Sequence, residues 1–306
     1  MDSITSYSDE QDCVPEERVE CLADYVKIVE RIAQQWRTTT KQRFLKSNPP
    51  IADFPGEMVP WFRGTTDAKY PLEPSLLRAH PVISKYNTDR TQIKRAERYM
   101  LLRFKGGELL RFSSVSVEKE RDWVFLMQHH GLPTRLLDWS KNSLTALYFA
   151  IRKYKQKTNP PDAAVWIMDP RRLSEACQLG RSIVFPREDK DARLDDYYSL
   201  SDNLAGPCYP IPVIPPILND RIAAQQSRFT YHTDEPRGLE KFAIDIARQD
   251  RCWYLRKLII PLDRQEHLLR SLRLVGVTQP DIVPGLDSLA TEILQRMALG
   301  VSDLEP

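Results

Sequence analysis

The sequence predicts an α+β fold with one main domain. Short apolar runs rich in aromatic and β-branched residues, such as residues 163–169, alternate with segments of helical periodicity. No repeat of fixed period appears, and no break in composition divides residues 57–298 into two parts. Hydrophobic residues make up 42% of the 306-residue chain, which is enough to bury a core.

The N-terminal region predicts a helix that precedes the main domain. Residues 1–14 are polar and are expected to be disordered, and a helix followed by a Pro-rich linker is expected over residues 15–56. Pro15 suits the first turn of a helix because its missing N–H costs nothing there. An apolar stripe follows at spacings of three and four: Val19, Leu22, Val26, Val29, Ala33 and Trp36. We expect this stripe to pack on the main domain, and a homodimer seam through residues 15–37 is the alternative.

The first half of the main domain predicts two extended segments and three helices. In order, they are a strand at 58–64, a helix at 91–112, a helix at 118–130, an extended segment at 132–140 and a helix beyond it. Gly106 and Gly107 are expected to interrupt or end the first helix, and Gly131 to cap the second. Ser140 or Asn142 is expected to cap the third.

The second half predicts short strands and two more helices. Strands are expected at 163–169, 229–232 and 257–261, and an edge strand or an extended tether at 210–218. Helices are expected at 264–275 and from Asp287 or Ser288 to Met297. Residues 180–210 hold charge clusters and few aliphatic residues, so they are expected to be a surface loop. A loop of that length is typical of a lid or binding segment.

Composition excludes several function classes. Lys plus Arg number 44 and Asp plus Glu 42, so a dedicated polyanion binder is not expected, although a local basic cleft is compatible with this balance. The eleven glycines form neither GxGxxG nor a Walker A loop. This absence argues against a Rossmann dehydrogenase, a P-loop NTPase and a protein kinase.

Cysteine and histidine spacing gives no sign of a metal site. The five cysteines form no CxxC pair and the five histidines form no HExxH, so no metal and no disulfide framework are expected. The N-terminus shows no apolar signal segment, and no apolar run approaches the ~18 residues of a membrane span. The sequence therefore predicts a cytoplasmic protein with no membrane partner.

Three islands of polar residues carry the candidate chemistry. In the first, residues 61–65, an arginine follows an apolar strand, and its planar guanidinium suits a phosphate or carboxylate. The second, residues 128–140, gathers His, Gln, Arg, Asp and Ser around a turn between helices. In the third, residues 221–229, Arg221 and Gln225 share a face if the segment is helical. Taken singly, each also has a structural interpretation as an internal ion pair, a helix cap or a solvated surface.

Together and in this order, the islands resemble the FRG domain, a family named for its aromatic-Arg-Gly motif. The resemblance covers roughly residues 57 to 294, so we place the domain at 57–298 with a tail at 299–306. It is carried by Trp61-Phe-Arg-Gly64, Gln128-His-His-Gly-Leu-Pro-Thr-Arg-Leu-Leu-Asp-Trp-Ser140, Ala146-Leu-Tyr-Phe-Ala150, Arg221 to Phe229, Ile259-Ile-Pro261 and Pro284-Gly-Leu-Asp-Ser-Leu-Ala290.

A weaker resemblance is to ADP-ribosyltransferases of the arginine-first class. It implies a mixed or split β-sheet flanked by helices, NAD as co-substrate, and catalytic roles for Arg63, Asp138 and Gln225. The positions that it implies for holding the dinucleotide are Phe62, Gly64, Gln128, His129, Arg135, Trp139, Ser140 and Arg221. The second motif reads Asp-Trp-Ser here where that class has Ser-Thr-Ser, and the third motif offers Gln rather than Glu.

The chemistry of NAD cleavage defines what such a site needs. Breaking the nicotinamide bond creates positive charge on the ribose, so a site should hold the pyrophosphate with a cation and place an anion near the ribose. Arg63 suits the first role. Gln225 carries no charge, so Asp138 is the expected carboxylate.

Three function classes remain open on the sequence. The first is NAD cleavage with transfer of ADP-ribose to a protein, a nucleic acid or water, in a toxin or phage-defence setting. The second is a non-catalytic module that binds a nucleotide or nucleic acid through Arg63, Arg135, Arg221 and Arg228 with aromatic side chains between them. The third is a nuclease or other hydrolase with His129 or His130 as general base.

Overall fold

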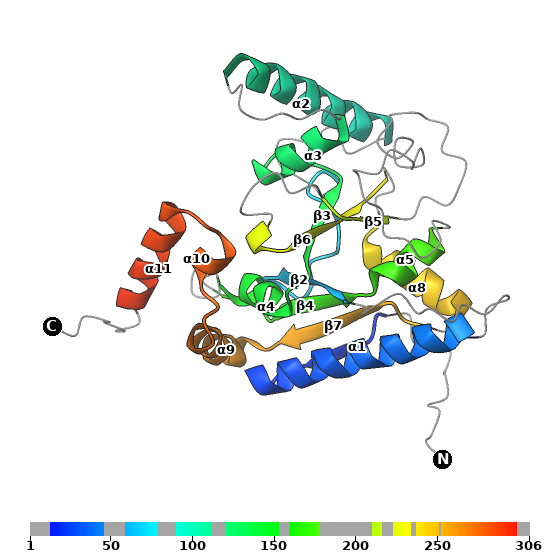
Figure 1. The fold of residues 1–306 in the computed structure, drawn as a ribbon, viewed down its shortest axis with the longest axis vertical. Helices are drawn as coiled ribbons and strands as arrows, with labels where there is room; N and C mark the ends of the chain where they lie inside the picture. The colour runs from blue at the N-terminus through cyan, green and yellow to red at the C-terminus, as the bar shows by residue number, and fades with distance from the viewer. Residues whose placement is uncertain are drawn as a thin grey trace.

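The computed structural model describes residues 13–45, 59–78, 90–111, 120–152, 159–177, 210–215, 223–233, 237–250 and 252–298. Over these residues the chain forms a seven-stranded sheet with helices on both faces (Figure 1), so the predicted α+β class is confirmed. Most of the predicted N-terminal lead-in, the second part of the linker, the loop at 180–209, Arg221 and the tail at 299–306 lie outside the described residues.

The sheet is mixed, as the sequence predicts. Its strands are β1 (Glu16–Arg18), β2 (Trp61–Thr65), β3 (Leu136–Ser140), β4 (Ala163–Met168), β5 (Ile211–Val213), β6 (Ser227–Tyr231) and β7 (Leu255–Ile260). Their order is β1-β7-β4-β2-β3-β6-β5, in which β1 runs parallel to β7 and the other neighbours are antiparallel. Every residue of β4 is buried, which explains why its sequence is apolar on both faces.

The sheet divides into two halves between β2 and β3. β2 pairs with β4 over five residues, and β3 pairs with β6 over five residues. β2 and β3, in contrast, pair only between Phe62 and Ser140. The half-sheet β1-β7-β4-β2 and the half-sheet β3-β6-β5 are therefore joined at a single residue pair, and the ladder does not continue beyond it.

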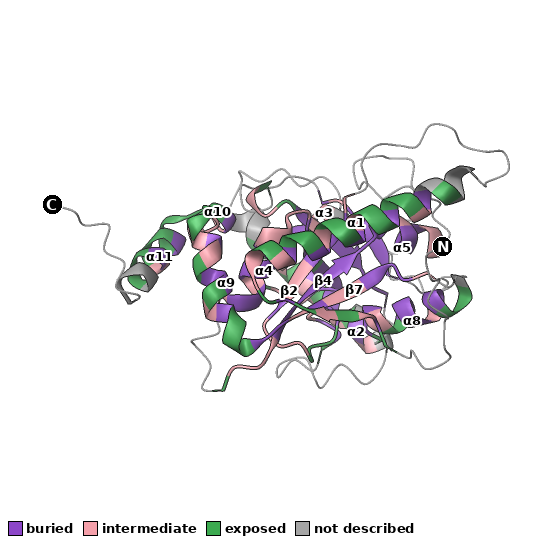
Figure 2. Ribbon diagram, turned by 90° about the horizontal axis from the view of Figure 1, so that it is seen from below, coloured by how far each residue is buried: buried purple, intermediate pink, exposed green. Residues whose placement is uncertain are grey.

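Helices cover both faces of this sheet. They are α1 (Leu22–Leu45), α2 (Arg90–Arg111), α3 (Glu120–His129), α4 (Ser143–Ile151), α5 (Pro170–Ala176), α8 (Leu239–Asp250), α9 (Leu262–Leu274), α10 (Gln279–Ile282) and α11 (Leu286–Ala298). One core cluster joins α1, α4 and α9 to Phe62, Val165 and Ile167. A second cluster joins α3, α5 and α8 to Trp61 and Trp166, which point to the opposite face. Figure 2 shows α1 lying over the buried strands with its outer side exposed.

The N-terminal helix begins at Leu22, which corrects its predicted start at Pro15. Residues 16–18 form β1 instead, since Lys257 N donates to Pro15 O and Val19 N donates to Ile259 O beside this short strand. The apolar residues that α1 buries are Tyr25, Ile28, Ile32 and Trp36, whereas Val26 of the predicted stripe is 46% exposed. The apolar face of α1 therefore packs within one chain, so the predicted dimer seam has no further support.

Glycine has different effects at two predicted helix ends. Gly106 and Gly107 lie within α2 and do not interrupt it, and a Cβ at either position would meet nothing within 4 Å. Glycine on such an open helix face costs only about 1 kcal/mol. Gly131 follows α3 with φ of +80°, and Leu132 N donates to Met127 O, so the predicted C-terminal cap is confirmed.

Candidate functional site

A cavity of 430 Å³ opens at the division between β2 and β3. We call it the split cavity. Its described lining comes from β2, β3, α4, the turn before β6, the end of α3 and the segment 66–78. Its volume falls in the range of about 300–1,000 Å³ that is usual for small-molecule sites. The three predicted catalytic residues, Arg63, Asp138 and Gln225, all line it.

Arg63 crosses from β2 to β3. Its Nη1 donates to the backbone oxygen of Asp138 at 2.7 Å and lies 3.5 Å from Asp138 Oδ2. The Arg63 side chain thus donates to a carbonyl oxygen of β3 near the point where the backbone pairing between β2 and β3 stops. Burial lowers the pKa of Arg63, and the Asp138 carboxylate opposes this shift. The guanidinium remains a cation because its ordinary pKa is far above neutrality.

Asp138 presents a carboxylate to the split cavity from the middle of β3. Its side chain is 54% exposed, although both neighbours on the strand, Leu137 and Trp139, are buried. Oδ1 accepts a hydrogen bond from Gln128 Nε2 at 2.9 Å, and Oδ2 faces Arg63. The carboxylate is therefore held by groups from two other elements while one side of it stays open to a ligand.

Gln225 reaches the same cavity from the turn that precedes β6. Its backbone oxygen accepts a hydrogen bond from Ser140 Oγ at 2.7 Å, which ties this turn to the end of β3. The next residue, Gln226, has φ of 46°, so the chain turns sharply there before the strand begins. Gln225 Nε2 is buried and has no acceptor among the described residues. A buried donor of this kind is one that a bound ligand would satisfy.

Helix α4 forms the wall beside β2, and it lies very close to the strand. A Cβ at Gly64 would be 2.0 Å from Ala146 O, so only glycine permits this approach. Asn142 caps the helix by accepting hydrogen bonds from two backbone N–H groups of its first turn, which selects one of the two predicted caps. Phe149 of α4 and Arg152, the residue that follows this helix, line the cavity, and the Arg152 guanidinium lies 4.7 Å from the Phe149 ring.

The split cavity combines positive charge with aromatic surface. Its described charged residues are Arg63, Arg78, Arg152 and Asp138, that is, three cations and one anion. Tyr70, Phe149 and Trp139 supply aromatic rings. Guanidinium groups suit phosphate oxygens, and aromatic rings suit a planar base. Arg78, Tyr70, Phe149 and Arg152 were not predicted as site residues, although Phe149 and Arg152 lie three positions apart on the predicted helix and so share a face.

The indole of Trp139 is held by a series of buried, hydrogen-bonded side chains. Trp139 Nε1 donates to Thr230 Oγ1 at 3.1 Å, and Thr230 Oγ1 is 3.0 Å from His232 Nε2. Burial lowers the pKa of His232 to about 3, and the charges of Arg63 and Arg135 act in the same direction. His232 is therefore neutral at physiological pH and serves as a hydrogen-bonding group rather than as a cation.

Two predicted binding residues, Arg135 and His129, do not line the described part of the split cavity. Arg135 is 2% exposed, and its guanidinium bonds to Glu97 Oε2 at 2.6 Å, so it anchors α2 to the sheet. His129 ends α3 and does not line the split cavity, and the same holds for His130. Arg221 lies outside the described residues. The cavity thus gives no support to a hydrolase that uses either histidine.

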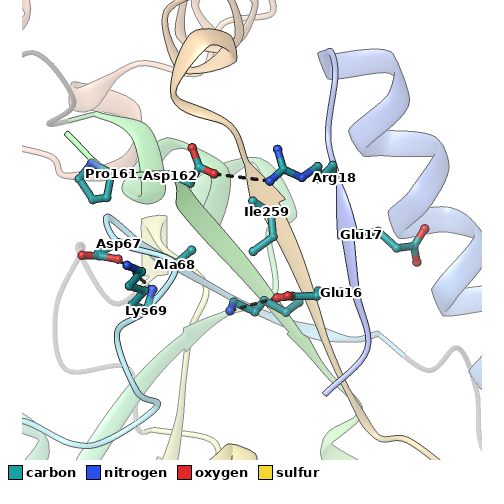
Figure 3. Close-up of a pocket in the computed structure, with 10 residues that line it drawn as sticks. Glu16, Glu17, Arg18, Asp67, Ala68, Lys69, Pro161, Asp162 and Ile259 are labelled. Atoms are coloured by element: carbon teal, nitrogen blue, oxygen red, sulfur yellow. Dashed lines mark hydrogen bonds and ion pairs between the residues drawn. The ribbon is translucent and has the colours of Figure 1, made fainter. Parts of the chain in front are cut away.

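A second and larger cavity of 590 Å³ lies over β1 and β7 (Figure 3). We call it the β1–β7 groove, and its lining residues are Glu16, Glu17, Arg18, Asp67, Ala68, Lys69, Pro161, Asp162, Lys257 and Ile259. Lys257 pairs with Glu16 at 3.1 Å, and Arg18 points toward Asp162 at 4.0 Å. Glu17 points toward α1, where it pairs with Arg31. None of these residues was predicted as a site residue.

Two negative findings apply to the described ranges alone. There, no group of three or more His, Cys, Asp or Glu side chains is arranged to hold a metal ion. Within the same ranges, every helix is too short or too polar to cross a bilayer.

Comparison with known proteins identifies the domain. Residues 59–159 match the family model of the FRG domain, so the predicted family is confirmed by a match that includes the first two polar islands. No curated protein and no solved structure matches the chain.

Proposed function

We propose that the FRG domain of this chain binds NAD in the split cavity and cleaves its nicotinamide–ribose bond, passing ADP-ribose to a macromolecule or to water. One observation carries the proposal: Arg63, Asp138 and Gln225, which come from distant parts of the sequence, line one cavity. The sheet division and the cationic, aromatic lining support a ligand with phosphates and planar rings.

Each group has a role that its chemistry allows. Arg63, with Arg78 and Arg152 around it, would hold the pyrophosphate. The C1′–N bond breaks with its electron pair passing to the pyridinium nitrogen, which leaves nicotinamide neutral. The acceptor's lone pair then forms a bond to C1′, and its proton passes to solvent. Asp138 supplies the negative charge that stabilises the ribose cation between these events.

Asp138 is the only carboxylate in the described lining, which is why we assign it this role. Gln225 contributes a donor, Nε2, that has no acceptor among the described residues. A ribose hydroxyl is an acceptor of suitable size for that group. Gln225 thus orients the sugar, while Asp138 carries the charge.

The test measures NAD binding and nicotinamide release by the purified full chain. We expect Arg63→Ala to weaken NAD binding about 100-fold, because a charge-assisted contact with phosphate is lost. Asp138→Asn should bind NAD within about threefold of the wild type but release nicotinamide about 100-fold more slowly. If the folded wild type neither binds NAD nor releases nicotinamide, the proposal is wrong.

The second candidate is a module that binds a nucleotide or nucleic acid without cleaving it. The three arginines and the aromatic rings of the split cavity favour it equally well. The dependence of ligand binding on salt concentration distinguishes nucleic-acid binding from NAD binding. A protein that contacts 6–10 phosphates of a polynucleotide loses about 10³-fold or more in affinity between 50 and 200 mM salt. NAD in a compact cavity should lose only a few-fold over the same range.

A further inference from the structure

Both oxygens of the Asp138 carboxylate are held by side chains. Oδ2 faces Arg63 at 3.5 Å, and Oδ1 accepts from Gln128 Nε2 at 2.9 Å. Arg63 and Gln128 come from β2 and α3, so the carboxylate is fixed between two elements that are separate in the sequence. A carboxylate fixed in this way keeps one orientation, whereas a half-exposed aspartate with a single contact would rotate about χ2.

The orientation of the Gln128 amide follows from its two hydrogen-bond partners, Asp138 and Thr134. Leu136 N donates to Thr134 Oγ1 at 3.1 Å, so the hydroxyl oxygen already acts as an acceptor. Its single proton is directed to Gln128 Oε1, which lies 2.6 Å away. The Asp138 carboxylate can only accept, so it selects the Nε2 end of the amide, and the Thr134 hydroxyl donates to the Oε1 end that remains. A flipped amide is therefore excluded, because it would place Gln128 Oε1 against Asp138 Oδ1, and neither oxygen can donate a hydrogen bond.

The backbone of Thr134 is itself fixed at both ends. Its N–H donates to Ser75 Oγ at 3.3 Å, and its carbonyl accepts from Leu76 N at 3.2 Å. Thr134 is fully buried, so water does not compete for these contacts. The hydroxyl thus has a defined position from which to anchor the Gln128 amide.

We propose that Gln128 is a positioning residue for Asp138 and that the Thr134 hydroxyl anchors the amide of Gln128 in the position from which it donates to Asp138. The inference rests on the proposed function for its catalytic part, while the arrangement itself is testable without any ligand. It also changes the role predicted for Gln128: its amide donates to Asp138 and accepts from Thr134, so it acts on the ligand through Asp138 rather than by binding it directly.

A ligand-free experiment tests the arrangement by NMR. The side-chain amide of Gln128, assigned by its loss in Gln128→Glu, should resonate downfield because it donates to a carboxylate. The downfield position should be lost in Asp138→Ala and in Thr134→Val, which removes only the hydroxyl, and kept in Thr134→Ser. Gln265 is the internal control, since its amide donates to Pro161 O and Ile260 O far from these residues and should not change. An unchanged Gln128 signal in folded Thr134→Val would overturn the inference.

A kinetic experiment tests the positioning role. With NAD as substrate, Thr134→Val should lower the rate of nicotinamide release roughly 10–100-fold while the Kd for NAD stays within about twofold, and Thr134→Ser should restore the rate. Gln128→Met, which keeps the length of the side chain, should match Thr134→Val if the latter does not fold. A wild-type rate in both variants would refute the role.

The two experiments separate the two proposals. If the NMR pattern appears but the wild type does not cleave NAD, the orientation of Asp138 by Gln128 and Thr134 stands and the proposed function fails. If NAD is cleaved but the NMR pattern is absent, the function stands and this inference fails.

Discussion

The split cavity and the β1–β7 groove are both lined by charged residues, yet they differ in how those charges are used. The groove is the larger, at 590 Å³ against 430 Å³. Its four carboxylates each have a partner within the chain: Glu16 pairs with Lys257, Glu17 with Arg31, Asp162 with Arg18, and Asp67 accepts from Lys69 N. The split cavity has three arginines against one carboxylate and a buried donor, Gln225 Nε2, without an acceptor among the described residues.

We infer from this difference that the balance of charges in the lining, rather than volume, is the property to compare when a site for an anionic ligand is sought. Ion pairs that close on one another stabilise an exposed surface only slightly, by about 0–1 kcal/mol each, and leave little attraction for a ligand. The lining of the split cavity, in contrast, holds more cations than carboxylates among its described residues. The smaller cavity is therefore the better candidate for an anionic ligand.

The largest expected effect concerns the wall of the split cavity. Gly64→Ala should destabilise the protein by about 3 kcal/mol or more, because the new Cβ would overlap the backbone oxygen of Ala146. Urea unfolding followed by circular dichroism measures this loss. Gly106→Ala is the matched control, since nothing lies within 4 Å of its Cβ, and it should be neutral or stabilising by up to about 1 kcal/mol. Equal stability of the two variants would show that α4 does not lie so close to β2.

An intermediate effect is expected at Asp169, a carboxylate that belongs to neither cavity. Its Oδ1 caps α5, while Oδ2 is buried without a partner among the described residues. Burial raises the pKa of Asp169 to about 7, above its ordinary 3.8. The folded state therefore binds the proton more tightly than the unfolded state, so this group's contribution to stability is complete below pH ~4 and is lost as the pH rises through 7.

Asp169→Asn tests this assignment because it keeps the capping oxygen and removes the charge. The stability of the variant relative to the wild type should increase between pH 4 and pH 8 by roughly 2–4 kcal/mol. Unfolding midpoints measured at both pH values give this difference. The contribution of His232 to the pH dependence has the opposite sign, and it cancels because both proteins contain His232. A difference that does not change with pH would mean that Asp169 ionises freely in the folded protein.

The smallest expected effect compares one cation in each cavity. Arg152, which lines the split cavity, lies 4.7 Å from the Phe149 ring, and Lys257, which lines the groove, lies 5.2 Å from the Trp166 ring, so each cation lies near an aromatic ring. Arg152→Met should weaken NAD binding about tenfold, and Lys257→Met should change it less than about twofold. Calorimetric titration gives both constants. If Lys257→Met weakened NAD binding more than Arg152→Met does, the ligand site would have to be assigned to the groove.

Most of the secondary structure was predictable from local signals. The strands β2, β4, β6 and β7 and the helices α2, α3, α4, α9 and α11 lie at or near their predicted positions. β1, α5, α8 and α10 were not predicted. β1 has only three residues and exists because β7 pairs with it, so its sequence contains no strand signal of its own. α5 has seven residues and is defined by its cap Asp169 and by Pro170 rather than by periodicity.

The candidate site was predictable only in part. Arg63, Asp138 and Gln225 line the split cavity as their motifs suggested, but Arg135 does not, because it is buried in an ion pair with Glu97 of α2. Nothing in the residues around Arg135 distinguishes it from Arg63. The difference lies in the partner, which is 38 positions away and reaches it only after α2 packs on the sheet.

The sequence alone indicated the family, the α+β class and the helix cap at Gly131, because these depend on residue identity within a few positions. It limited the cap of α4 to Ser140 or Asn142, and the structure selected Asn142. Only the tertiary structure decided that the sheet divides at Phe62 and Ser140 and that Arg78 and Arg152 join Arg63 at this division. Long-range pairing and burial set these features. They depend on which surfaces meet when the chain folds, which no short stretch of sequence specifies.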